Sequence, residues 1–473
     1  MIFDVSSITG ITADSRKVQR GFVFVALSGS KLDGSSYIAD AVAAGAKYIV
    51  VGKGAKTQDI GSVQWLEVEN PRQFLAHTAA AFYKNQPHHI VAVTGTNGKT
   101  STVNFARMIW AEIGKKSASL GTLGLMGEGL EPVAGMTTPD PVSLFSTLAD
   151  LSAKGFTHLA MEASSHGLHQ HRLDGVKIQA GGITNITRDH LDYHGTMDDY
   201  FDAKLRLFSE VVGDGGVAVI NADIPQYADI RNCAVNRGLD IITYGLSDGA
   251  DLRIVNRVAV SNGQDITLNV FGKTYQVHLN LVGEFQAMNV LCAAGLVLAD
   301  KSIPHHSVVS VLDKIQGVAG RLQPVPHSLK DVGVYIDYAH TPDGLETILN
   351  ALRPHATGRL ICVFGCGGDR DTGKRPVMGE ISARLADITI VTDDNPRSEM
   401  PDVIRSEIMV GAKSAINIGG RRNAIREAVK NLKAGDVLVV AGKGHEQGQI
   451  FADHTENFDD LTETQSALQS FFQ

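Results

Sequence analysis

The chain alternates between short apolar segments and polar loops, and the first apolar segments already predict a mixed α/β structure. Residues 21–27 (GFVFVAL) and 46–52 (AKYIVVG) are rich in β-branched and aromatic side chains, which predicts two buried strands. The segment between them, 37–46 (YIADAVAAGA), predicts a helix. This unit ends near Pro87, because the polar, proline-containing segment FYKNQPHH marks a boundary.

From Ile90 onward the pattern becomes strand, glycine-rich loop and helix, and it repeats. The strands predicted in this way lie at 90–93 (IVAV), 157–162 (THLAME) and 180–186 (AGGITNI). Such alternation favours a parallel sheet with helices on both faces. A helical segment at 284–299 closes this part, and residues 317–326 (GVAGRLQPVP) are typical of a linker.

The last third alternates in the same way, and each apolar strand is followed by a loop rich in Gly, Asp, Arg or His. These segments are 333–344 (GVYIDYAHTPDG), 359–371 (RLICVFGCGGDRD), 388–401 (ITIVTDDNPRSEMP) and 436–447 (DVLVVAGKGHEQ). In an open α/β sheet, ligands bind beyond the carboxyl ends of the strands. The sequence thus predicts an α/β protein of three domains: a small N-terminal domain at 1–87, a central parallel-sheet domain at 88–322 and a Rossmann-like domain at 323–473.

Length and composition agree with this picture and exclude some classes of partner. A chain of 473 residues is too long for one core, and its net charge of −8 argues against a nucleic-acid partner. No apolar run approaches the roughly 20 residues that span a membrane, and the N-terminus has no leader pattern. Four cysteines do not make a disulfide framework, and Cys362 is expected in a buried strand. We expect a cytoplasmic protein with reduced thiols.

A phosphate-binding loop is predicted between the strand at 90–93 and the next helix. The segment VTGTNGKTST places Gly95, Gly98, Lys99 and Thr100 there, although Gly95 lies closer to the lysine than in the usual P-loop. Main-chain N–H groups would surround phosphate oxygens, Lys99 would supply a charge, and the Thr100 hydroxyl could bind magnesium. A glycine-rich turn that merely caps a helix would explain the glycines but not the Gly–Lys–Thr run.

Glu162 and a group of histidines are the next candidates. Glu162 ends a predicted strand, where its carboxylate could meet magnesium, although a surface carboxylate is the alternative. His190 and His194 lie in NITRDHLDYHG, and three further histidines lie in SSHGLHQHR. Their spacings fit no familiar zinc site and cysteine partners are missing, which argues against zinc.

Lys204 lies in a predicted helix at 196–208, which has apolar residues at 197, 201, 205 and 208. Thr196 and Asp199 could form a capping box at its start. Lys204 does not belong to the apolar stripe, and on this pattern alone a solvent-exposed lysine is expected.

The segment TGTNGKTST at 94–102 strongly resembles the ATP loop of the Mur ligase superfamily, which includes the folylpolyglutamate synthases. The resemblance implies three domains and an acyl-phosphate mechanism that requires ATP and Mg2+. It assigns ATP binding to Gly95, Thr96, Asn97, Gly98, Lys99, Thr100, Ser101, Asn289, Arg321 and Asp337, with Asp337 at the ribose.

The matching HG…YFxAK segment implies that Lys204 is carbamylated and helps to bind magnesium. The implied catalytic residues are Lys99, Glu162, His190 and Lys204, and the implied metal ligands are Thr100, Glu162, His190 and the Lys204 carbamate. An ordinary lysine is neutral only about once in 2,500 molecules at pH 7. Because carbon dioxide reacts with the neutral amine, desolvation and a nearby metal must favour the carbamate.

The N-terminal segment ADSRKVQRGFVFVALSGSKLDG resembles a uridine-nucleotide domain, which folylpolyglutamate synthases lack. Residues implied to contact a UDP-linked substrate are Ser15, Ser30, Lys31, Leu32, Thr137, Thr138, Ser164, Gln170 and Arg172. Some close relatives have an asparagine where this chain has Met136, so we expect one of their polar contacts to be absent.

The segment VTDDNPRSEMP raises the question of amino-acid specificity. Pro396 lacks an N–H and keeps Asn395 out of the helical region, so a rigid turn presents Arg397 after a strand. A solvated surface charge is one interpretation and recognition of a carboxylate is the other. In the family, DNPR marks enzymes that accept meso-diaminopimelate, whose second carboxylate a guanidinium can bind bidentately. The implied set is Arg370, Asp394, Asn395, Pro396, Arg397, Gly442 and Glu446, with Glu446 suited to the distal ammonium.

Together these motifs imply an ATP-dependent ligase that adds meso-diaminopimelate to UDP-N-acetylmuramoyl-L-alanyl-D-glutamate in peptidoglycan biosynthesis. We expect a monomer without nucleic-acid or membrane partners. A lysine-adding version of the same ligase is one alternative. A non-catalytic P-loop nucleotide-binding regulatory module is another, against which Lys99, Glu162, His190 and Lys204 argue.

Overall fold

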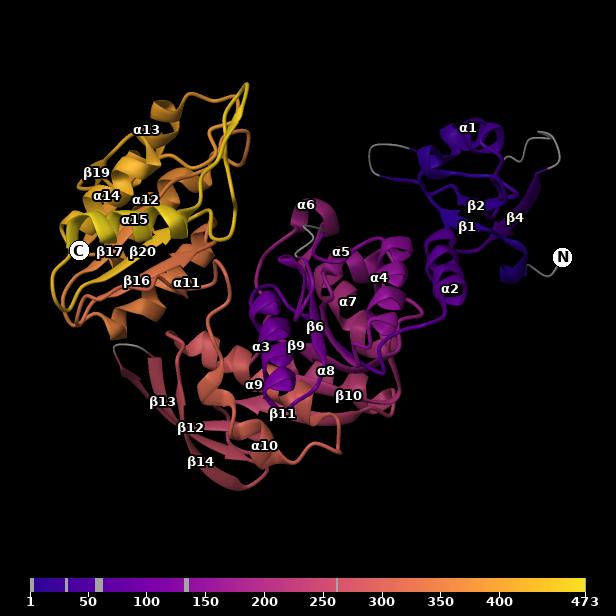
Figure 1. The fold of residues 1–473 in the computed structure, drawn as a ribbon, viewed down its shortest axis with the longest axis horizontal. Coiled ribbons are helices and arrows are strands. Elements are labelled where there is room, and N and C mark those ends of the chain that lie inside the picture. Colours follow the sequence, from indigo (N-terminus) through magenta and orange to yellow (C-terminus); the bar gives the residue numbers. More distant parts are fainter. Residues whose placement is uncertain (1–3, 30–32, 56–62, 132–135, 261–262, 473) are drawn as a thin grey trace. The chain divides into compact units, whose positions relative to one another are not determined.

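The computed structural model describes residues 4–29, 33–55, 63–131, 136–260 and 263–472. The chain divides into two compact units, and Figure 1 labels their helices and strands. The first consists of Met1–Arg253 and Leu291–Val308, and the second of Ile254–Val290 and Val309–Gln473.

The first unit begins with a small parallel sheet in the order β1-β2-β3-β4. Its elements are β1 (Gly10–Thr12), β2 (Phe22–Val25), α1 (Ile38–Ala43), β3 (Tyr48–Gly52), β4 (Gln64–Val68) and α2 (Pro71–Tyr83). The two strands and the helix predicted before Pro87 are confirmed as β2, β3 and α1. Asn70 caps α2 by accepting hydrogen bonds from two main-chain N–H groups, and Pro71 occupies the first turn, where no N–H is needed.

The larger sheet of this unit has the strand order β11-β10-β9-β5-β8-β6-β7, and β12 begins alongside β11. Only β7 runs antiparallel to its neighbour in this part of the sheet. The strands are β5 (His89–Thr94), β6 (Ser117–Gly121), β7 (Gly124–Gly127), β8 (His158–Glu162), β9 (Ile178–Ile183), β10 (Val212–Asn221), β11 (Asp240–Gly245) and β12 (Leu252–Val260).

Helices cover both faces of this sheet, as the alternating pattern predicts. They are α3 (Lys99–Glu112), α4 (Pro141–Ala153), α5 (Ser165–His169), α6 (Leu191–His194), α7 (Met197–Arg206), α8 (Tyr227–Asn236), α9 (Glu284–Leu298) and α10 (His305–Val309). Strand β9 shows the two layers directly. A Cβ on Gly181 would lie 3.1 Å from Leu207, whereas one on Gly182 would lie 3.1 Å from the Cys292 sulfur of α9. Successive residues of a strand face opposite sides, so these neighbours belong to different layers.

The second unit contains the antiparallel hairpin of β13 (Gly263–Val270) and β14 (Lys273–Leu279) and a sheet in the order β15-β16-β20-β17-β18-β19. That sheet is parallel except for β15. Its strands are β15 (Gln323–Pro324), β16 (Gly333–Asp337), β17 (Leu360–Phe364), β18 (Ile388–Val391), β19 (Ile416–Asn417) and β20 (Val437–Ala441), and a short hairpin joins β21 (Gln449–Ile450) to β22 (Thr455–Glu456). The predicted linker at 317–326 is thus partly wrong, because β15 lies within it and belongs to the sheet.

This sheet is also covered on both faces. Its helices are α11 (Pro342–Leu352), α12 (Lys374–Leu385), α13 (Pro401–Gly411), α14 (Arg421–Lys430) and α15 (Asp460–Phe472). Buried residues of α11, α12 and α13 form one hydrophobic cluster, and those of α14 and α15 form a second. Two separate clusters against one sheet are the mark of a doubly wound α/β fold.

Among the described residues, no helix is long and apolar enough to cross a membrane. All four cysteines are free thiols, and Cys362 is fully buried in β17, as its sequence context predicted.

The amino-terminal ends of β5 and β8 carry a buried aromatic group. The ring centroids of His158 and Trp110 are 5.0 Å apart, and those of His158 and His89 are 5.3 Å apart. Burial, together with the nearby imidazole of His89, lowers the pKa of His158 to about 4. The folded state thus favours the neutral imidazole.

We expect this group to make the first unit sensitive to acid. Because the pKa of His158 in the folded state lies below the ordinary 6.5, its contribution to the free energy of unfolding is complete above pH 6.5. This contribution is lost as the pH falls towards 4. The loss should reach about 1–3 kcal/mol. The variant His158→Phe keeps a ring but does not titrate, so its unfolding midpoint should fall less over this range. Urea melts at stepped pH test this, with the exposed His306→Gln as control. Parallel pH profiles for His158→Phe and the unmodified protein would contradict the assignment.

Candidate active site

The predicted phosphate loop lies between β5 and α3, as expected. Gly95 has φ +140° and Gly98, which precedes α3, has φ +88°, so both use the region that favours glycine. A Cβ on Gly95 would lie 1.9 Å from the Thr184 hydroxyl oxygen. The loop conformation therefore requires glycine at this position, and the strand–loop–helix context of a phosphate site is present.

The end of β9 braces this loop. The Thr184 hydroxyl donates to the Asn97 carbonyl oxygen (2.5 Å), and the Asn97 N–H donates to the Asn185 side-chain oxygen (2.9 Å). The Thr96 N–H donates to the main-chain oxygen of Asn185 (2.8 Å). These residues belong to the 180–186 segment, whose strand ends at Ile183, so the polar end of the predicted strand supports the loop.

Lys99 lies within the loop that it was predicted to serve. Its Nζ is 2.8 Å from the Gly95 carbonyl oxygen and 2.9 Å from that of Thr96. Thr100 and Ser101 occupy the first turn of α3 and are buried. A cation and the main-chain N–H groups of a helix N-terminus are thus adjacent, which suits an anionic ligand.

Glu162 is a buried carboxylate and not a surface one. It ends β8 beside Val93 of β5 and is 1% exposed. Its Oε1 accepts a hydrogen bond from the Thr122 N–H (2.8 Å), and its Oε2 accepts one from the Thr122 hydroxyl (3.2 Å). A Cβ on Gly121 would lie 2.1 Å from Oε1, so a glycine leaves room for the carboxylate.

Lys204 is buried, contrary to the expectation from the helical pattern alone. It is 1% exposed, and its Nζ donates to the Gly95 carbonyl oxygen at 2.8 Å. The Nζ also lies 4.4 Å from the ring centroid of Tyr200, and no described residue forms an ion pair with it. Burial, and secondly the charge of Lys99, lowers its pKa well below the ordinary value.

The apolar stripe predicted at 197, 201, 205 and 208 is only partly right. Phe208 is fully buried, but Met197, Phe201 and Leu205 are only partly buried, and the more deeply covered face consists of Tyr200, Ala203, Lys204 and Leu207. A count of apolar residues could not show that a lysine is buried on that face. The N-cap half of the predicted capping box is confirmed, because the Thr196 hydroxyl oxygen accepts a hydrogen bond from the Asp199 N–H (3.1 Å), while the Asp199 carboxylate accepts from the Thr196 hydroxyl (2.6 Å).

His190 lies in the loop after β9, in a left-handed conformation (φ +51°), and its side chain is half-exposed. Its ring centroid is 4.9 Å from that of His166, which in turn is 5.4 Å from His194. These are ring contacts. Within the described ranges, no three His, Cys, Asp or Glu side chains are arranged to hold a metal. The predicted magnesium ligands lie at the carboxyl ends of three adjacent strands. Thr100 follows β5, Glu162 ends β8 and His190 follows β9.

Four of the residues predicted to contact the UDP-linked substrate, Thr138, Ser164, Gln170 and Arg172, form a connected network. Arg172 donates to the Thr138 carbonyl oxygen (2.6 Å) and to Gln170 Oε1 (2.7 Å), and the Thr138 and Ser164 hydroxyls are 3.0 Å apart. Thr137 joins this network through a 3.2 Å contact between its hydroxyl and that of Thr122. The sulfur of Met136 lies 3.8 Å from Arg172 Nη1, so the contact of this guanidinium at residue 136 is with a weak acceptor.

A cavity of about 480 Å³ adjoins this network within the first unit. Arg172 and Gln170 line it, together with Asp14, Lys17 and Arg72. Ser15 begins the short helix capped by Asp14. The predicted contacts Ser30, Lys31 and Leu32 lie outside the described residues.

In the second unit, hydrogen bonds and a ring contact hold Asn289, Arg321 and Asp337, which are predicted to bind the nucleotide. The buried Asn289 donates to Gln286 (3.1 Å), which donates to the Arg321 carbonyl oxygen (3.0 Å). The Arg321 guanidinium lies 4.9 Å from the Tyr338 ring centroid. Asp337 ends β16, and its carboxylate accepts N–H groups of Leu322 and Ala339 (2.7 Å each). Burial raises the pKa of Asp337.

The turn after β18 holds Arg397 in a fixed position. Arg397 has φ +51°, and its main-chain N–H donates to the Ile450 carbonyl oxygen (3.0 Å). Its Nη1 donates to the Gly368 carbonyl oxygen (2.9 Å), and no described residue accepts from its Nε or Nη2. Arg370, in the loop after the neighbouring β17, is exposed and has no partner among the described residues. Two guanidinium groups, each with N–H donors that no described residue uses, therefore lie in the loops after two adjacent strands.

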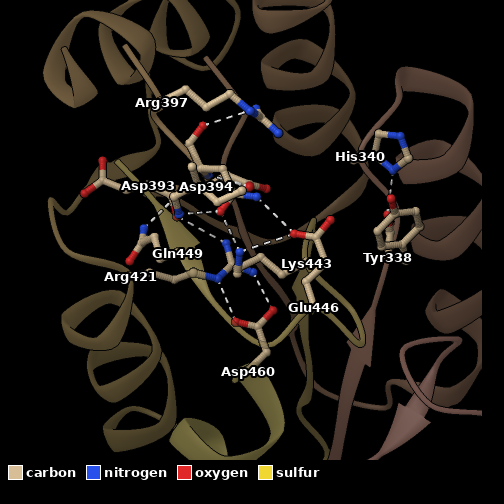
Figure 2. Close-up of polar contacts among 12 residues, drawn as sticks. Tyr338, His340, Asp393, Asp394, Arg397, Arg421, Lys443, Glu446, Gln449 and Asp460 are labelled. Atoms are coloured by element: carbon tan, nitrogen blue, oxygen red, sulfur yellow. Dashed lines mark hydrogen bonds and ion pairs between the residues drawn. The ribbon is translucent and has the colours of Figure 1, made fainter. Parts of the chain in front are cut away.

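Asn395, Lys443 and Glu446 form a hydrogen-bonded group beside this turn, and Figure 2 shows Lys443 and Glu446 of this group. Asn395 Oδ1 accepts from Lys443 Nζ (2.9 Å) and from the Ile450 N–H (3.0 Å), and its Nδ2 donates to Glu446 Oε2 (3.0 Å). Gly442 has φ +118°, and a Cβ there would lie 2.7 Å from the Asp394 carboxylate. Lys443 is fully buried and was not predicted, although its place in the strand-end segment AGKGHE was a signal.

Arg421 and Asp460 form a buried ion pair beneath the same turn, and neither side chain is exposed. Arg421 donates to both carboxylate oxygens (2.7 Å each) and to the Ala441 carbonyl oxygen (2.9 Å). Burial opposes the charge of Arg421, but the nearby carboxylate of Asp460 more than offsets it and raises its pKa. The pair joins α14 to α15 and supports the end of β20.

Comparisons with known proteins identify the family of this chain. The chain matches the Mur ligase family catalytic domain over residues 7–83, the Mur ligase middle domain over 93–297 and the Mur ligase glutamate ligase domain over 320–444. The chain belongs to the Mur ligase family, and it has the three-domain α/β fold of that family.

Particular relatives can be named. The UDP-N-acetylmuramoyl-L-alanyl-D-glutamate–2,6-diaminopimelate ligase of Rhizobium meliloti is 49% identical over 98% of this chain and 94% of its own length. The ligase of the same name from Caulobacter vibrioides is 50% identical over 98% of this chain and 96% of its own. A solved structure of a ligase of that name aligns with a TM-score of 0.74 and 33% identity, over 98% of this chain and 95% of that one. MurF ligase from Thermotoga maritima, solved with ADP, shares the fold (TM-score 0.63, 19% identity, 99% and 100% coverage).

We expect the Arg421–Asp460 pair to control the stability of the second unit. Asp460→Leu leaves the buried guanidinium without its carboxylate and should destabilise by about 3–5 kcal/mol. Adding Arg421→Met removes the unpaired charge, so the double variant should be more stable than Asp460→Leu alone. Denaturant melts measure this. The exposed pair of Arg384 and Glu346 is the control, and Arg384→Met should cost less than about 1 kcal/mol. Additive losses in the double variant would refute this account.

Proposed function

We propose that this protein is the ATP-dependent ligase that adds meso-diaminopimelate to UDP-N-acetylmuramoyl-L-alanyl-D-glutamate in peptidoglycan biosynthesis. The observation that carries the proposal is the geometry of Arg397. A rigid turn holds this guanidinium with two donor nitrogens unused by the described residues, and Asn395 of the same turn donates to the carboxylate of Glu446. Relatives named for this reaction are nearly half identical over almost the whole chain.

The reaction needs positioning and charge neutralisation more than a nucleophilic side chain. A carboxylate oxygen of the UDP-linked substrate attacks the γ-phosphorus of ATP, and ADP leaves. The amine nitrogen of the second substrate then attacks the acyl carbon, loses a proton, and expels phosphate. In this scheme, the N–H groups of the 95–101 loop and Lys99 bind the phosphates. Arg321, Asn289 and Asp337 bind the remainder of the nucleotide.

Magnesium, when bound, would neutralise phosphate charge during the transfer. The residues that would hold it are Thr100, Glu162, His190 and the carbamate of Lys204. The state of Lys204 supports this assignment, because its amine is buried, has a lowered pKa and forms no ion pair with the described residues. A carbamate forms when the neutral amine attacks carbon dioxide and releases a proton, and it would add an anionic oxygen ligand beside the phosphate loop.

The UDP-linked substrate would occupy the cavity lined by Gln170 and Arg172 in the first unit. Thr137, Thr138 and Ser164 would contact it through the network that also orients Arg172. Ser15, Ser30, Lys31 and Leu32 would contact its uridine diphosphate. We place the domain boundaries at residues 87/88 and 322/323. The first lies between the family matches over 7–83 and 93–297, and the second lies next to the start of the match over 320–444.

Diaminopimelate recognition would rest on charge complementarity. Arg397, aided by Arg370, would bind the distal carboxylate, and Glu446 would bind the distal ammonium. Asp394, Asn395, Pro396 and Gly442 complete the proposed site. Lysine lacks the second carboxylate and would leave Arg397 unpaired, so the lysine-adding alternative is disfavoured. The non-catalytic regulatory module is disfavoured because the phosphate loop, Glu162 and Lys204 are all present at one edge of the sheet.

The same reaction defines the cellular setting that we propose. The protein would act in the cytoplasm as a monomer, without nucleic-acid or membrane partners. Through cell-wall precursor synthesis it would contribute to cell shape and cell division.

The function is tested by assaying the purified protein with ATP, the UDP-linked substrate and each amino acid. We expect ADP release that depends on diaminopimelate and is far slower with lysine.

Arg397→Ala should lower kcat/KM for diaminopimelate by roughly 10- to 150-fold, because it removes a charged hydrogen bond. The KM for ATP should change little. Arg384→Ala, an exposed arginine of the same unit, is the control. Absence of acceptor-dependent ADP release would favour the regulatory alternative, and undiminished selectivity in Arg397→Ala would refute the assigned role.

Lys204→Ala should abolish turnover, because it removes both the buried amine and its carbamate. Short carboxylates such as acetate or formate imitate the carbamate, so adding them should restore part of the activity. Lys301→Ala, an exposed lysine of the same unit, should behave as the unmodified protein. If no carboxylate restores activity to a folded Lys204→Ala variant, the carbamate proposal loses its support.

A further inference from the structure

Arg375 is a fully buried arginine that the proposed reaction does not use. It lies in the first turn of α12, and its side chain has no exposed surface. Its Nη1 and Nη2 each lie 2.9 Å from an oxygen of Glu399, so this pair is bidentate. Nη1 also donates to Glu407 (2.7 Å), and Nη2 donates to the Gly367 carbonyl oxygen (3.3 Å). Charges are rarely buried so completely unless they organise their surroundings.

The partners of Arg375 lie on the two loops that carry Arg370 and Arg397. We call residues 365–371, after β17, and 394–399, after β18, the paired loops. Gly367 belongs to the first loop and Glu399 to the second. The same Glu399 Oε1 also accepts a hydrogen bond from the Asp369 N–H at 2.6 Å. One carboxylate therefore connects the buried guanidinium to the main chain of the opposite loop.

Other contacts make the paired loops one rigid body. Asp369 accepts hydrogen bonds from the hydroxyl (2.5 Å) and the N–H (3.2 Å) of Ser398. The Gly368 N–H donates to the Asn395 carbonyl oxygen (2.9 Å), and a Cβ on Gly368 would lie 1.9 Å from the Pro396 carbonyl oxygen. Arg397 Nη1 donates to the Gly368 carbonyl oxygen. The direction of the Arg397 guanidinium thus depends on where the first loop lies.

Glu407 provides a comparison within the same ion-pair group. It pairs with Arg375 at a similar distance, but it lies in α13 and makes no described contact with the paired loops. If Arg375 served only to stabilise the packing of α12 and α13, Glu399 and Glu407 would be equivalent. If it positions the loops, Glu399 matters for recognition and Glu407 does not.

We propose that Arg375, acting through Glu399, is a positioning residue that fixes the paired loops and thereby sets the preference for an amino acid with a distal carboxylate. This inference rests on the proposed function. Neither Arg375 nor Glu399 touches the substrate. Their effect is to fix the Gly368 carbonyl oxygen, which accepts a hydrogen bond from Arg397 Nη1. The Arg397 guanidinium is thereby held in the direction that a bidentate contact with the distal carboxylate requires.

The test compares Glu399→Gln with Glu407→Gln in the full-length protein. In Glu399→Gln the amide NH2 faces a guanidinium nitrogen, so donor meets donor and the loop contact weakens. We expect KM for diaminopimelate to rise about 10-fold or more, as for the loss of a charged hydrogen bond. KM for ATP and for the UDP-linked substrate, and kcat, should change by less than about 3-fold. The ratio of kcat/KM for diaminopimelate to that for lysine should fall.

Glu407→Gln should leave all three KM values within about 3-fold of the unmodified protein, even if both variants lower the unfolding midpoint alike. Equal effects of the two variants on KM for diaminopimelate, or no effect of Glu399→Gln, would overturn the proposal. The two levels of inference are separable, because an unmodified protein that does not use diaminopimelate would refute the proposed function itself. Arg375→Lys, which keeps the charge but not the bidentate geometry, should resemble Glu399→Gln if it folds.

Discussion

Parallel pairing of strands is the constraint on which the rest of this structure depends, because it brings the carboxyl ends of neighbouring strands to one edge of a sheet. In the first unit, β9, β5 and β8 bring the Thr184–Asn185 brace, the phosphate loop and Glu162 to the same edge. In the second unit, β16, β20, β17 and β18 do the same for the loops that carry Asp337, Glu446, Arg370 and Arg397. Each loop supplies one or two groups, and the sheet supplies their spacing.

Both edges also contain buried charge. The Lys204 amine lies against the Gly95 carbonyl oxygen in the first unit, and Arg375, Arg421 and Lys443 are fully covered in the second. A buried charge is unfavourable unless acceptors surround it, so each one fixes the groups that it contacts. Backbone strain adds to this cost, since a non-glycine residue in the left-handed region, such as Arg397, is disfavoured by roughly 1–3 kcal/mol. Order at the loops is thus maintained by polar contacts beneath them.

The sequence predicted the strands and most strand-end residues because their signals are local. A run such as ICVFGCGG is visible as a strand with a loop, and DNPR is visible as a rigid turn. The buried face of α7 was predicted only in part, because counting apolar residues could not place a lysine on the covered face. Arg421 with Asp460, and Arg375 with Glu399, were missed for another reason. The members of each pair lie far apart in the chain, and only the fold brings them together.

The Asn395–Pro396 sequence has a consequence for the chemical durability of the protein. The side-chain amide of an asparagine is lost most readily when the following main-chain nitrogen gives up its proton and attacks the side-chain carbonyl carbon to form a succinimide. Proline has no such proton, so this route is closed at Asn395. The Asn395 amide is also held at both ends, by Lys443 and Ile450 at its oxygen and by Glu446 at its nitrogen. The proline that stiffens the turn therefore also protects the neutral amide from slow conversion to an aspartate, whose negative charge would lie next to Glu446.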